Sequence, residues 1–275
     1  MKHTHLIQAT LACAMVVAMA APAAAGRESK RAPNTWALIT DGNVKINTYF
    51  FGAGFEASEG FTIGDFDGQQ NWTASGMDLP FASISNANPF TGSQHLRMVY
   101  DPTMTQGTTR IVLSPEQPTP PFTVNTVYIK VNISDDGGAD YDIIGQAPSQ
   151  SVLTWRVKFS WSDDTNTGPG MIYVLDNVNG GLVFVNTGVQ WAHGIYKELR
   201  VDFTPGEIRY YYDGALIYTG AVIAGSAVEQ VGIVHDNWQL PNETADFDAL
   251  SVQTLGEPPV AVKSMTWSQV KSLLR

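Results

Sequence analysis

Two short stretches of the chain combine aromatic rings with hydrogen-bonding side chains, the combination that a sugar-binding surface needs. Asp236, Asn237 and Trp238 follow one another, and Trp191 lies two residues before His193. An indole can stack on the apolar face of a sugar ring, while carboxylate, amide and imidazole groups bind its hydroxyls. These five residues are therefore predicted to bind a ligand. The alternative is that each tryptophan belongs to the hydrophobic core.

A third stretch offers polar side chains without a ring. Asp163, Asp164 and Asn166 lie in a loop that follows a predicted strand. Trp155 and Trp161 lie in that strand at positions that share one apolar face, because successive side chains alternate between the two faces of a sheet. We therefore assign both tryptophans to the core and keep the polar loop as a further ligand-binding candidate.

Four carboxylates near the two ends of the predicted sheet domain could hold calcium. Glu56 lies near its start and Asp248 near its end, where the first and last strands are expected to pair. Glu59 and Asp246 lie close to them in the sequence and, with backbone carbonyls, could complete the oxygen shell that Ca²⁺ prefers. The sequence therefore predicts one structural calcium ion. The alternative is that these carboxylates are ordinary charges at a sheet edge.

Residues 196–219 carry the clearest secondary-structure signal. Their first part alternates apolar and charged residues, as a half-buried strand does. Asp213-Gly214 then separates two aromatic and β-branched runs, which is the strongest short-range signal of a hairpin. The stretch therefore predicts three antiparallel strands. The pairs expected across the hairpin are Tyr212 with Ala215, Tyr211 with Leu216 and Tyr210 with Ile217.

The charge of the chain excludes some classes of partner. Its 275 residues include 16 basic and 26 acidic side chains, which give a net charge of −10. This charge argues against nucleic acid and anionic lipid as partners, and it is compatible with calcium. The one cysteine, Cys13, lies in the N-terminal apolar segment, so a large core rather than disulfides must stabilise the rest.

The first 25 residues are expected to be a secretory signal peptide. A short charged start precedes an apolar run over residues 6–21, and an A-x-A cleavage site ends at Ala25. The apolar run is shorter than the roughly 20 residues that a membrane-spanning helix needs. We therefore expect a secreted, extracellular or cell-surface protein with no membrane span.

Two stretches resemble concanavalin A-like lectin/glucanase (LamG-like) jelly-roll domains of exported bacterial proteins. Residues 196–217, with L-x-V-x-F and I-x-Y-Y-x-D-G-x-L-I, are similar to their late meander. Residues 55–98, with F-E-x-S-E-G-F, G-Q-x-x-W, S-N and G-S-Q-x-L-R in order, resemble their opening and that of Phe-Glu-initiated carbohydrate-binding modules. The resemblance implies an all-β antiparallel β-sandwich, a turn at residues 92–94 before a buried strand, and a structural Ca²⁺ where Glu56 and Asp248 meet.

The acids that enzymes of this fold use are not matched. Hydrolysis of a glycosidic bond needs two facing carboxylates, and the resemblance implies an E-x-D-x-x-E strand, which is absent. Glu198 and Asp202 share a strand face, but Arg200 lies between them, so they are interpreted as paired charges. Residues 190–197 are only superficially similar to lyase elements, and an R-x-E-x-R strand is absent.

Four segments are expected: the signal peptide (1–25), a linker or edge segment (26–48), the β-sandwich (49–254) and a C-terminal tail (255–275). The tail begins with a stiff linker at Pro258-Pro259 and continues as a short amphipathic helix that includes Trp267 and Leu273. It resembles short terminal tails of exported bacterial proteins, so a sorting or docking partner is expected to read it. The alternative is a helix packed on its own domain.

Together these features favour a secreted, non-catalytic, lectin-like module that binds a glycan or polysaccharide. Two alternatives remain open at this stage. One is a structural or surface-layer adhesion protein that uses the same fold without sugar. The other is a divergent polysaccharide lyase or glycoside hydrolase.

Overall fold

The structure of the protein is a computed structural model. It describes residues 35–40, 43–76, 80–100, 105, 108–116, 125–134, 139–166, 168–204, 206–225, 228–237 and 243–254. The predicted signal peptide and the predicted C-terminal tail lie outside these residues, so both stay predictions. In the part of the chain that is described, no helix has the length and apolar character to cross a bilayer.

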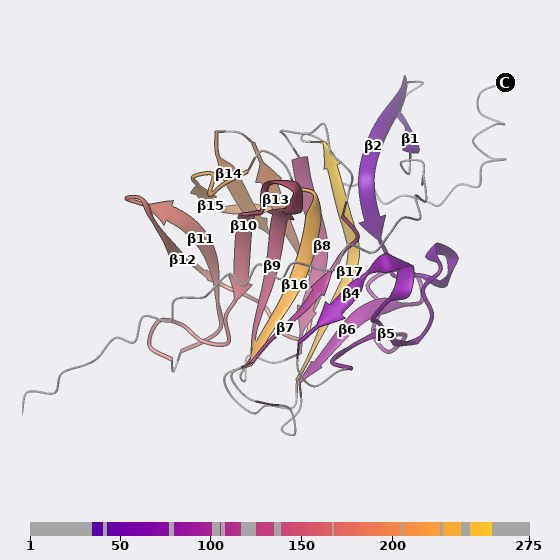
Figure 1. Cartoon of the computed structure of the whole chain (residues 1–275), viewed down its shortest axis with the longest axis horizontal. Helices are drawn as coiled ribbons and strands as arrows, with labels where there is room; N and C mark the ends of the chain where they lie inside the picture. The colour runs from indigo at the N-terminus through magenta and orange to yellow at the C-terminus, as the bar shows by residue number, and fades with distance from the viewer. Residues whose placement is uncertain are drawn as a thin grey trace, which may run out of the picture. The chain divides into compact units, whose positions relative to one another are not determined.

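The strands form two antiparallel sheets, which Figure 1 shows as two layers. The first contains β1 (Thr35–Thr40), β2 (Asn43–Ala53), β3 (Gly64–Asp65), β5 (Ala82–Ser85), β6 (His95–Tyr100), β8 (Asn125–Ile133), β13 (Lys197–Phe203), β14 (Ile208–Tyr212), β15 (Ala215–Gly220) and β17 (Glu243–Thr254). The second contains β4 (Thr73–Ser75), β7 (Thr109–Leu113), β9 (Ala139–Ala147), β10 (Val152–Phe159), β11 (Met171–Val178), β12 (Gly181–Gln190) and β16 (Gln230–Asn237). Three short 3-10 helices are η1 (Ala57–Glu59), η2 (Gln69–Asn71) and η3 (Pro148–Gln150).

Hairpins between consecutive strands set part of the strand order, and the other neighbours, such as β8 with β17, are far apart in the sequence. The ten-stranded sheet runs β15-β14-β13-β8-β17-β6-β5-β3, with β2 also paired to β17 and β1 to β2. The seven-stranded sheet runs β12-β11-β10-β9-β16-β7-β4. The opening strand β2 lies beside the closing strand β17, with Ala53 opposite Leu250, so the expected pairing of the two ends of the domain is confirmed.

Apolar side chains with a period of two residues fill the space between the sheets. On β9, Tyr141 and Ile143 are fully buried, and on β10 the same holds for Trp155 and Val157. A single sheet would leave the apolar side chains of these strands exposed to water. Packing one sheet against the other buries them. The predicted fold class, an all-β antiparallel β-sandwich of jelly-roll type, is confirmed.

In the hairpin β14–β15, the alternating sequence pattern predicts the cross-strand pairs next to the turn but not those farther from it. Tyr212 lies opposite Ala215 and Tyr211 opposite Leu216, as expected. The register then shifts, and Tyr210 lies opposite Tyr218 rather than Ile217, so the third predicted pair is wrong. The shift is a β-bulge, which inserts one extra residue into β15 without any change in the alternating pattern of the sequence.

Candidate functional site

The side of the seven-stranded sheet that faces away from the core gathers charged and aromatic side chains. On β10, Trp155 and Val157 point into the core, so Arg156 and Lys158 point the other way. Residues opposite each other in the register share a face, and this extends the group across neighbouring strands. We call the group the outer sheet face: Asp140, Asp142, Arg156, Lys158, Tyr173, Phe184, Asn186 and Asp236, with Asp164 from the loop before β11.

Two cations and three carboxylates form an ionic cluster at the centre of this face. Lys158 Nζ lies 2.9 Å from Asp140 Oδ2. Arg156 donates to Oδ2 of Asp142 through its guanidinium, and one of its nitrogens lies 3.5 Å from Oδ2 of Asp236. Both cations are therefore paired with carboxylates of the same sheet.

Burial sets the protonation of Asp142. This side chain is fully buried, and loss of hydration raises its pKa to about 6, although the charges of Arg156 and Lys158 oppose the shift. Asp236 and Asp140 add to the increase because each brings a like charge close to it. Asp142 can therefore change its protonation state near pH 6, whereas an ordinary aspartate does so near pH 4.

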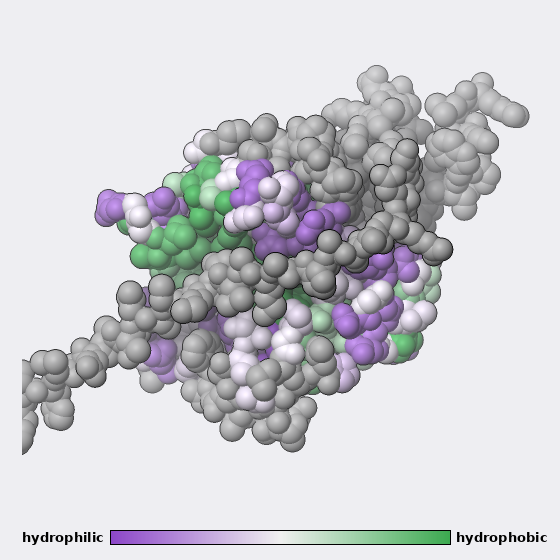
Figure 2. Space-filling model, viewed as in Figure 1, coloured by the Kyte–Doolittle hydropathy of each residue, from purple (hydrophilic) through white to green (hydrophobic). Residues whose placement is uncertain are grey.

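Aromatic rings border the cluster on the β11–β12 side. Phe184 is 39% exposed, and both Lys158 Nζ and the Arg156 guanidinium lie over its ring, 4.6 and 5.1 Å from the ring centre. Figure 2 shows apolar surface gathered over this hairpin, to which the exposed side chains Leu182 and Val183 contribute. A half-exposed ring beside cations is a surface on which a ligand can stack.

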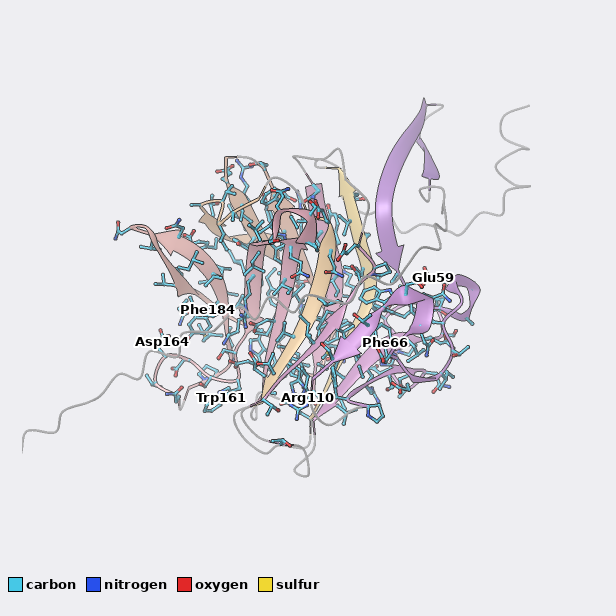
Figure 3. All side chains as sticks on the ribbon, in the orientation of Figure 1. Glu59, Phe66, Arg110, Trp161, Asp164 and Phe184 are labelled. Atoms are coloured by element: carbon cyan, nitrogen blue, oxygen red, sulfur yellow. The ribbon has the colours of Figure 1, made fainter. Side chains whose placement is uncertain are left out.

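A polar triad lies next to this ring. The Tyr173 hydroxyl donates to Asp164 Oδ1 at 2.6 Å, and Asn186 Nδ2 donates to Asp164 Oδ2 at 3.1 Å. Burial and the bond to Asp164 raise the pKa of Tyr173, so it stays protonated as a donor. Figure 3 shows Asp164 and Phe184 near β11 and β12. Of the polar loop predicted from the sequence, Asp164 is thus brought to this face.

Of the predicted ligand residues Asp236, Asn237 and Trp238, the structure describes only the first in full. Asp236 belongs to the ionic cluster, where its Cα lies opposite that of Asp140. The backbone of Asn237 ends β16, but its side chain and the whole of Trp238 lie outside the described residues. The role predicted for Asn237 and Trp238 therefore stays a prediction.

The predicted pair Trp191 and His193 lines a hollow of about 360 Å³, together with Gln190 and Ala192. Trp191 is 4% exposed, and its Nε1 donates to the carbonyl of Ser160 at 2.8 Å. Its ring meets that of His193 edge to face, 6.1 Å between centres. Trp191 thus serves the core and leaves little of its face for a sugar, whereas His193 is exposed.

The two tryptophans assigned to the core also differ. Trp155 is fully buried, as predicted. Trp161 is only half-buried, so its assignment to the core is wrong. The strand ends at Phe159, and alternation no longer sets the direction of side chains beyond it. The backbone N–H of Trp161 instead donates to Asp140 Oδ1 at 3.0 Å, which places this residue beside the outer sheet face.

Glu198 and Asp202 are paired charges, as interpreted from the sequence, although only Asp202 pairs with Arg200. Glu198 accepts a hydrogen bond from Lys130 at 3.0 Å. Asp202 accepts two hydrogen bonds from Arg200, at 2.8 and 2.6 Å, and one from the hydroxyl of Thr126 at 2.9 Å. Two carboxylates held in this way are not free to act on a glycosidic bond.

Three of the four carboxylates predicted to bind calcium, Glu56, Asp246 and Asp248, contact the loop between β5 and β6. Glu56 accepts hydrogen bonds from the backbone N–H groups of Ser93 (2.8 Å) and Gln94 (3.1 Å) and from the hydroxyl of Ser93 (2.8 Å). Gly92 has a φ of +64°, and a Cβ there would overlap the Glu56 carboxylate. The turn expected at residues 92–94 is therefore present, and Glu56 holds it in place.

Asp248, on the closing strand β17, holds the same loop. It accepts the backbone N–H groups of Phe90 (2.9 Å), Thr91 (3.0 Å) and Ala249 (2.6 Å). Burial raises the pKa of Asp248 to about 6; the backbone N–H groups oppose this shift, and the nearby charge of Glu56 adds to it. Glu56 and Asp248 are thus near each other, as the sequence predicts, but both bind the protein.

Asp246 is engaged more completely. Its carboxylate binds Arg97 through two hydrogen bonds, at 2.7 and 3.0 Å, and also accepts from Asn88 Nδ2 at 3.1 Å and lies 3.0 Å from His95 Nε2. Burial raises the pKa of Asp246, but these hydrogen bonds outweigh burial and place its pKa below the usual value. The side chain is therefore held ionised in the interior.

The four carboxylates as arranged do not fit a calcium shell. Glu59 accepts the backbone N–H groups of Gly54 (2.9 Å) and Glu56 (3.1 Å), so each of the four faces protein donors. Among the described residues, no three acidic, histidine or cysteine side chains are grouped as metal ligands would be. A Ca²⁺ ion needs 6–8 oxygen ligands that face the ion, and hydrogen-bond donors occupy these positions here.

Chelation tests the calcium prediction directly. Because hydrogen-bond donors of the protein face all four carboxylates, we expect EDTA to leave the melting temperature of the protein unchanged. The measurement is a thermal unfolding curve with EDTA, followed by one after excess Ca²⁺ is added. A lower melting temperature in EDTA that Ca²⁺ restores would show that the predicted ion is present.

Several residues of the outer sheet face were missed by sequence reasoning. Asp140 and Asp142 are two residues apart on one strand, and Arg156 and Lys158 are two residues apart on the next. In each pair the two charged residues alternate with core residues, and this alternation is the signal in the sequence that could have placed them on the outer face. The sequence does not reveal the register that places Lys158 opposite Asp142, nor that β16 adds Asp236 on the other side of β9, so the cluster could not be assembled from it.

Comparison with known proteins defines the class of fold. No model of a known protein family and no curated protein sequence match the chain. A sialidase structure matches with a TM-score of 0.50 and 15% identity over 77% of this chain and 19% of its own, so the chain spans about a fifth of that protein's length. At this identity the likeness shows the fold alone, a jelly-roll β-sandwich.

Two smaller structures match less well. An alginate lyase in complex with dimannuronate matches with a TM-score of 0.46 and 9% identity, over 66% of this chain and 80% of its own. A β-glucanase of Bacillus licheniformis matches with a TM-score of 0.42 and 13% identity, over 67% of this chain and 92% of its own.

Proposed function

We propose that the protein is a non-catalytic carbohydrate-binding β-sandwich and that the outer sheet face binds the glycan. The observation that carries the proposal is Phe184, a ring 39% exposed on an apolar strand, beside the hydrogen-bonded triad of Tyr173, Asp164 and Asn186. Sugars are bound where a ring can stack on C–H groups while neighbouring polar side chains bind hydroxyls. Recognition outside the cell agrees with the signal peptide predicted from the sequence.

The names of the sialidase, the alginate lyase and the glucanase refer to carbohydrate chemistry, which agrees with the proposal. Fold likeness does not transfer a ligand, so the proposal rests on the residues of the outer sheet face. Its non-catalytic part rests on Arg156, which binds Asp142 and lies next to Asp236. Hydrolysis of a glycosidic bond needs one carboxyl group that donates a proton and a second carboxylate across the bond. Asp142 and Asp236 both face the Arg156 guanidinium, so neither is placed for these roles.

Removing the ring of Phe184 tests the proposal. We expect Phe184→Ala to weaken glycan binding about 10-fold, because loss of one stacking contact of about 1–1.5 kcal/mol changes a dissociation constant by that factor. Binding is measured by affinity electrophoresis through gels that contain individual polysaccharides. Release of reducing ends or of unsaturated uronates is measured on the same samples and is expected to be absent.

Phe90, in the loop between β5 and β6 of the ten-stranded sheet, offers a matched control. It is 43% exposed, and Lys130 Nζ lies 4.8 Å from its ring centre, so it resembles Phe184 in exposure and in its cation contact. Phe90→Ala should leave binding unchanged. The proposed site would be wrong if the two variants had the same effect, and the non-catalytic assignment would be wrong if products accumulated.

A further inference from the structure

Two carboxylate oxygens at the centre of the outer sheet face are buried without a hydrogen-bond partner in the described part of the chain. They are Oδ1 of Asp142 and Oδ1 of Asp236. In both residues it is the other oxygen, Oδ2, that faces Arg156. A buried polar atom without a hydrogen-bond partner raises the free energy of the folded protein, because its lost hydration is not replaced. A ligand that donates a hydrogen bond to each oxygen would recover this free energy.

The charge of the cluster selects the kind of ligand. Asp140, Asp142 and Asp236 bring three negative charges, whereas Arg156 and Lys158 bring two positive charges that are already paired. A sugar carboxylate would meet a net negative surface and two acceptor oxygens, and it has no proton to donate to them. The hydroxyls of an uncharged sugar are donors and bring no charge.

We infer that the outer sheet face takes a neutral, hydroxyl-rich glycan rather than a uronate polymer, with Asp142 and Asp236 accepting hydrogen bonds from its hydroxyls. The inference rests on the proposed function and adds the class of ligand. Arg156 lies 5.1 Å from the ring centre of Phe184 and also faces both carboxylates. The stacking ring and the acceptor oxygens therefore lie around one guanidinium, where one short stretch of glycan can reach both.

The test compares two classes of polymer on the full chain. Laminarin and galactomannan serve as neutral probes, and alginate and polygalacturonate serve as uronate probes, in affinity gels of the same ionic strength. We expect retardation by at least one neutral probe and none by the uronates. Retardation by uronates alone would overturn this inference and leave the proposed function standing. Absence of retardation by all four would overturn both.

A variant locates the acceptor. Asp236 is the milder position to change, because its side chain is 16% exposed and lies 3.5 Å from Arg156. Asp236→Asn should weaken binding of the neutral probe about 10-fold, the factor that corresponds to roughly 1.4 kcal/mol. Asp213→Asn, at an exposed ion pair on the hairpin β14–β15, is the control and should bind like the unmodified protein. Wild-type binding by Asp236→Asn with an unchanged melting temperature would overturn the assignment.

Discussion

Replacement of Asp246 by alanine is expected to lower the free energy of unfolding by about 3–5 kcal/mol, the range for breaking a buried ion pair by removing one partner. The carboxylate is 3% exposed and binds Arg97 through two hydrogen bonds. It also lies 3.0 Å from Nε2 of the fully buried His95. Without it, the fully buried His95 and the partly buried Arg97 both lose this acceptor. Equilibrium unfolding in guanidinium chloride measures the change.

An exposed ion pair is the control for this prediction. Lys197 Nζ lies 2.6 Å from Asp213 Oδ2, but the aspartate side chain is 55% exposed. Water and salt screen such a pair, and asparagine tolerates the positive φ at this turn position, so Asp213→Asn should lower the unfolding free energy by no more than about 1 kcal/mol. Equal effects of the two substitutions would show that burial does not set the strength of the Asp246 interactions.

The effect of Asp246→Ala should also depend on pH. Because hydrogen bonds hold the pKa of Asp246 below its usual value, the folded state binds its proton less readily than the unfolded state does. The stabilisation is therefore complete above the unfolded pKa of about 3.9 and is lost as the pH falls through the lower, folded value. The difference between the two proteins should shrink below about pH 4.

Replacement of Trp155 by alanine is the second substitution with a large expected effect, a loss of about 3–5 kcal/mol of unfolding free energy. The indole is fully buried and lies over Gly145 on the neighbouring strand β9, where a Cβ would overlap the ring. Removal of the ring leaves a cavity that the rigid sheets cannot close. The midpoint of denaturant unfolding measures this loss.

Trp161→Ala provides the comparison for the core position. This ring is half-buried and follows the end of β10, so water can enter the space that it leaves. Its loss should cost less, on the order of 1 kcal/mol, as for substitutions away from a packed core. A larger effect at Trp161 than at Trp155 would contradict the division between core and outer sheet face.

The reach of sequence reasoning differs between the fold and the site. Alternation in β10 and β13 and the Asp213-Gly214 turn predict strands and a sandwich, because period-two burial and positive φ are local properties. The carboxylates Glu56 and Asp248 were expected to meet, and they do. Their partners were not foreseen, because a carboxylate that holds backbone N–H groups has the same sequence signature as one that holds a metal ion.

The chain by itself determined which residues alternate between core and solvent and where it turns, and its net negative charge argues against polyanionic partners. Tertiary structure alone decided that Asp236 joins Asp142 and Arg156, which lie at least 80 residues earlier in the chain, and that Trp191 is covered while Phe184 is not. The reason is strand order. Which strands become neighbours, and in what register, depends on long-range packing and on bulges, and neither leaves a mark in the local pattern.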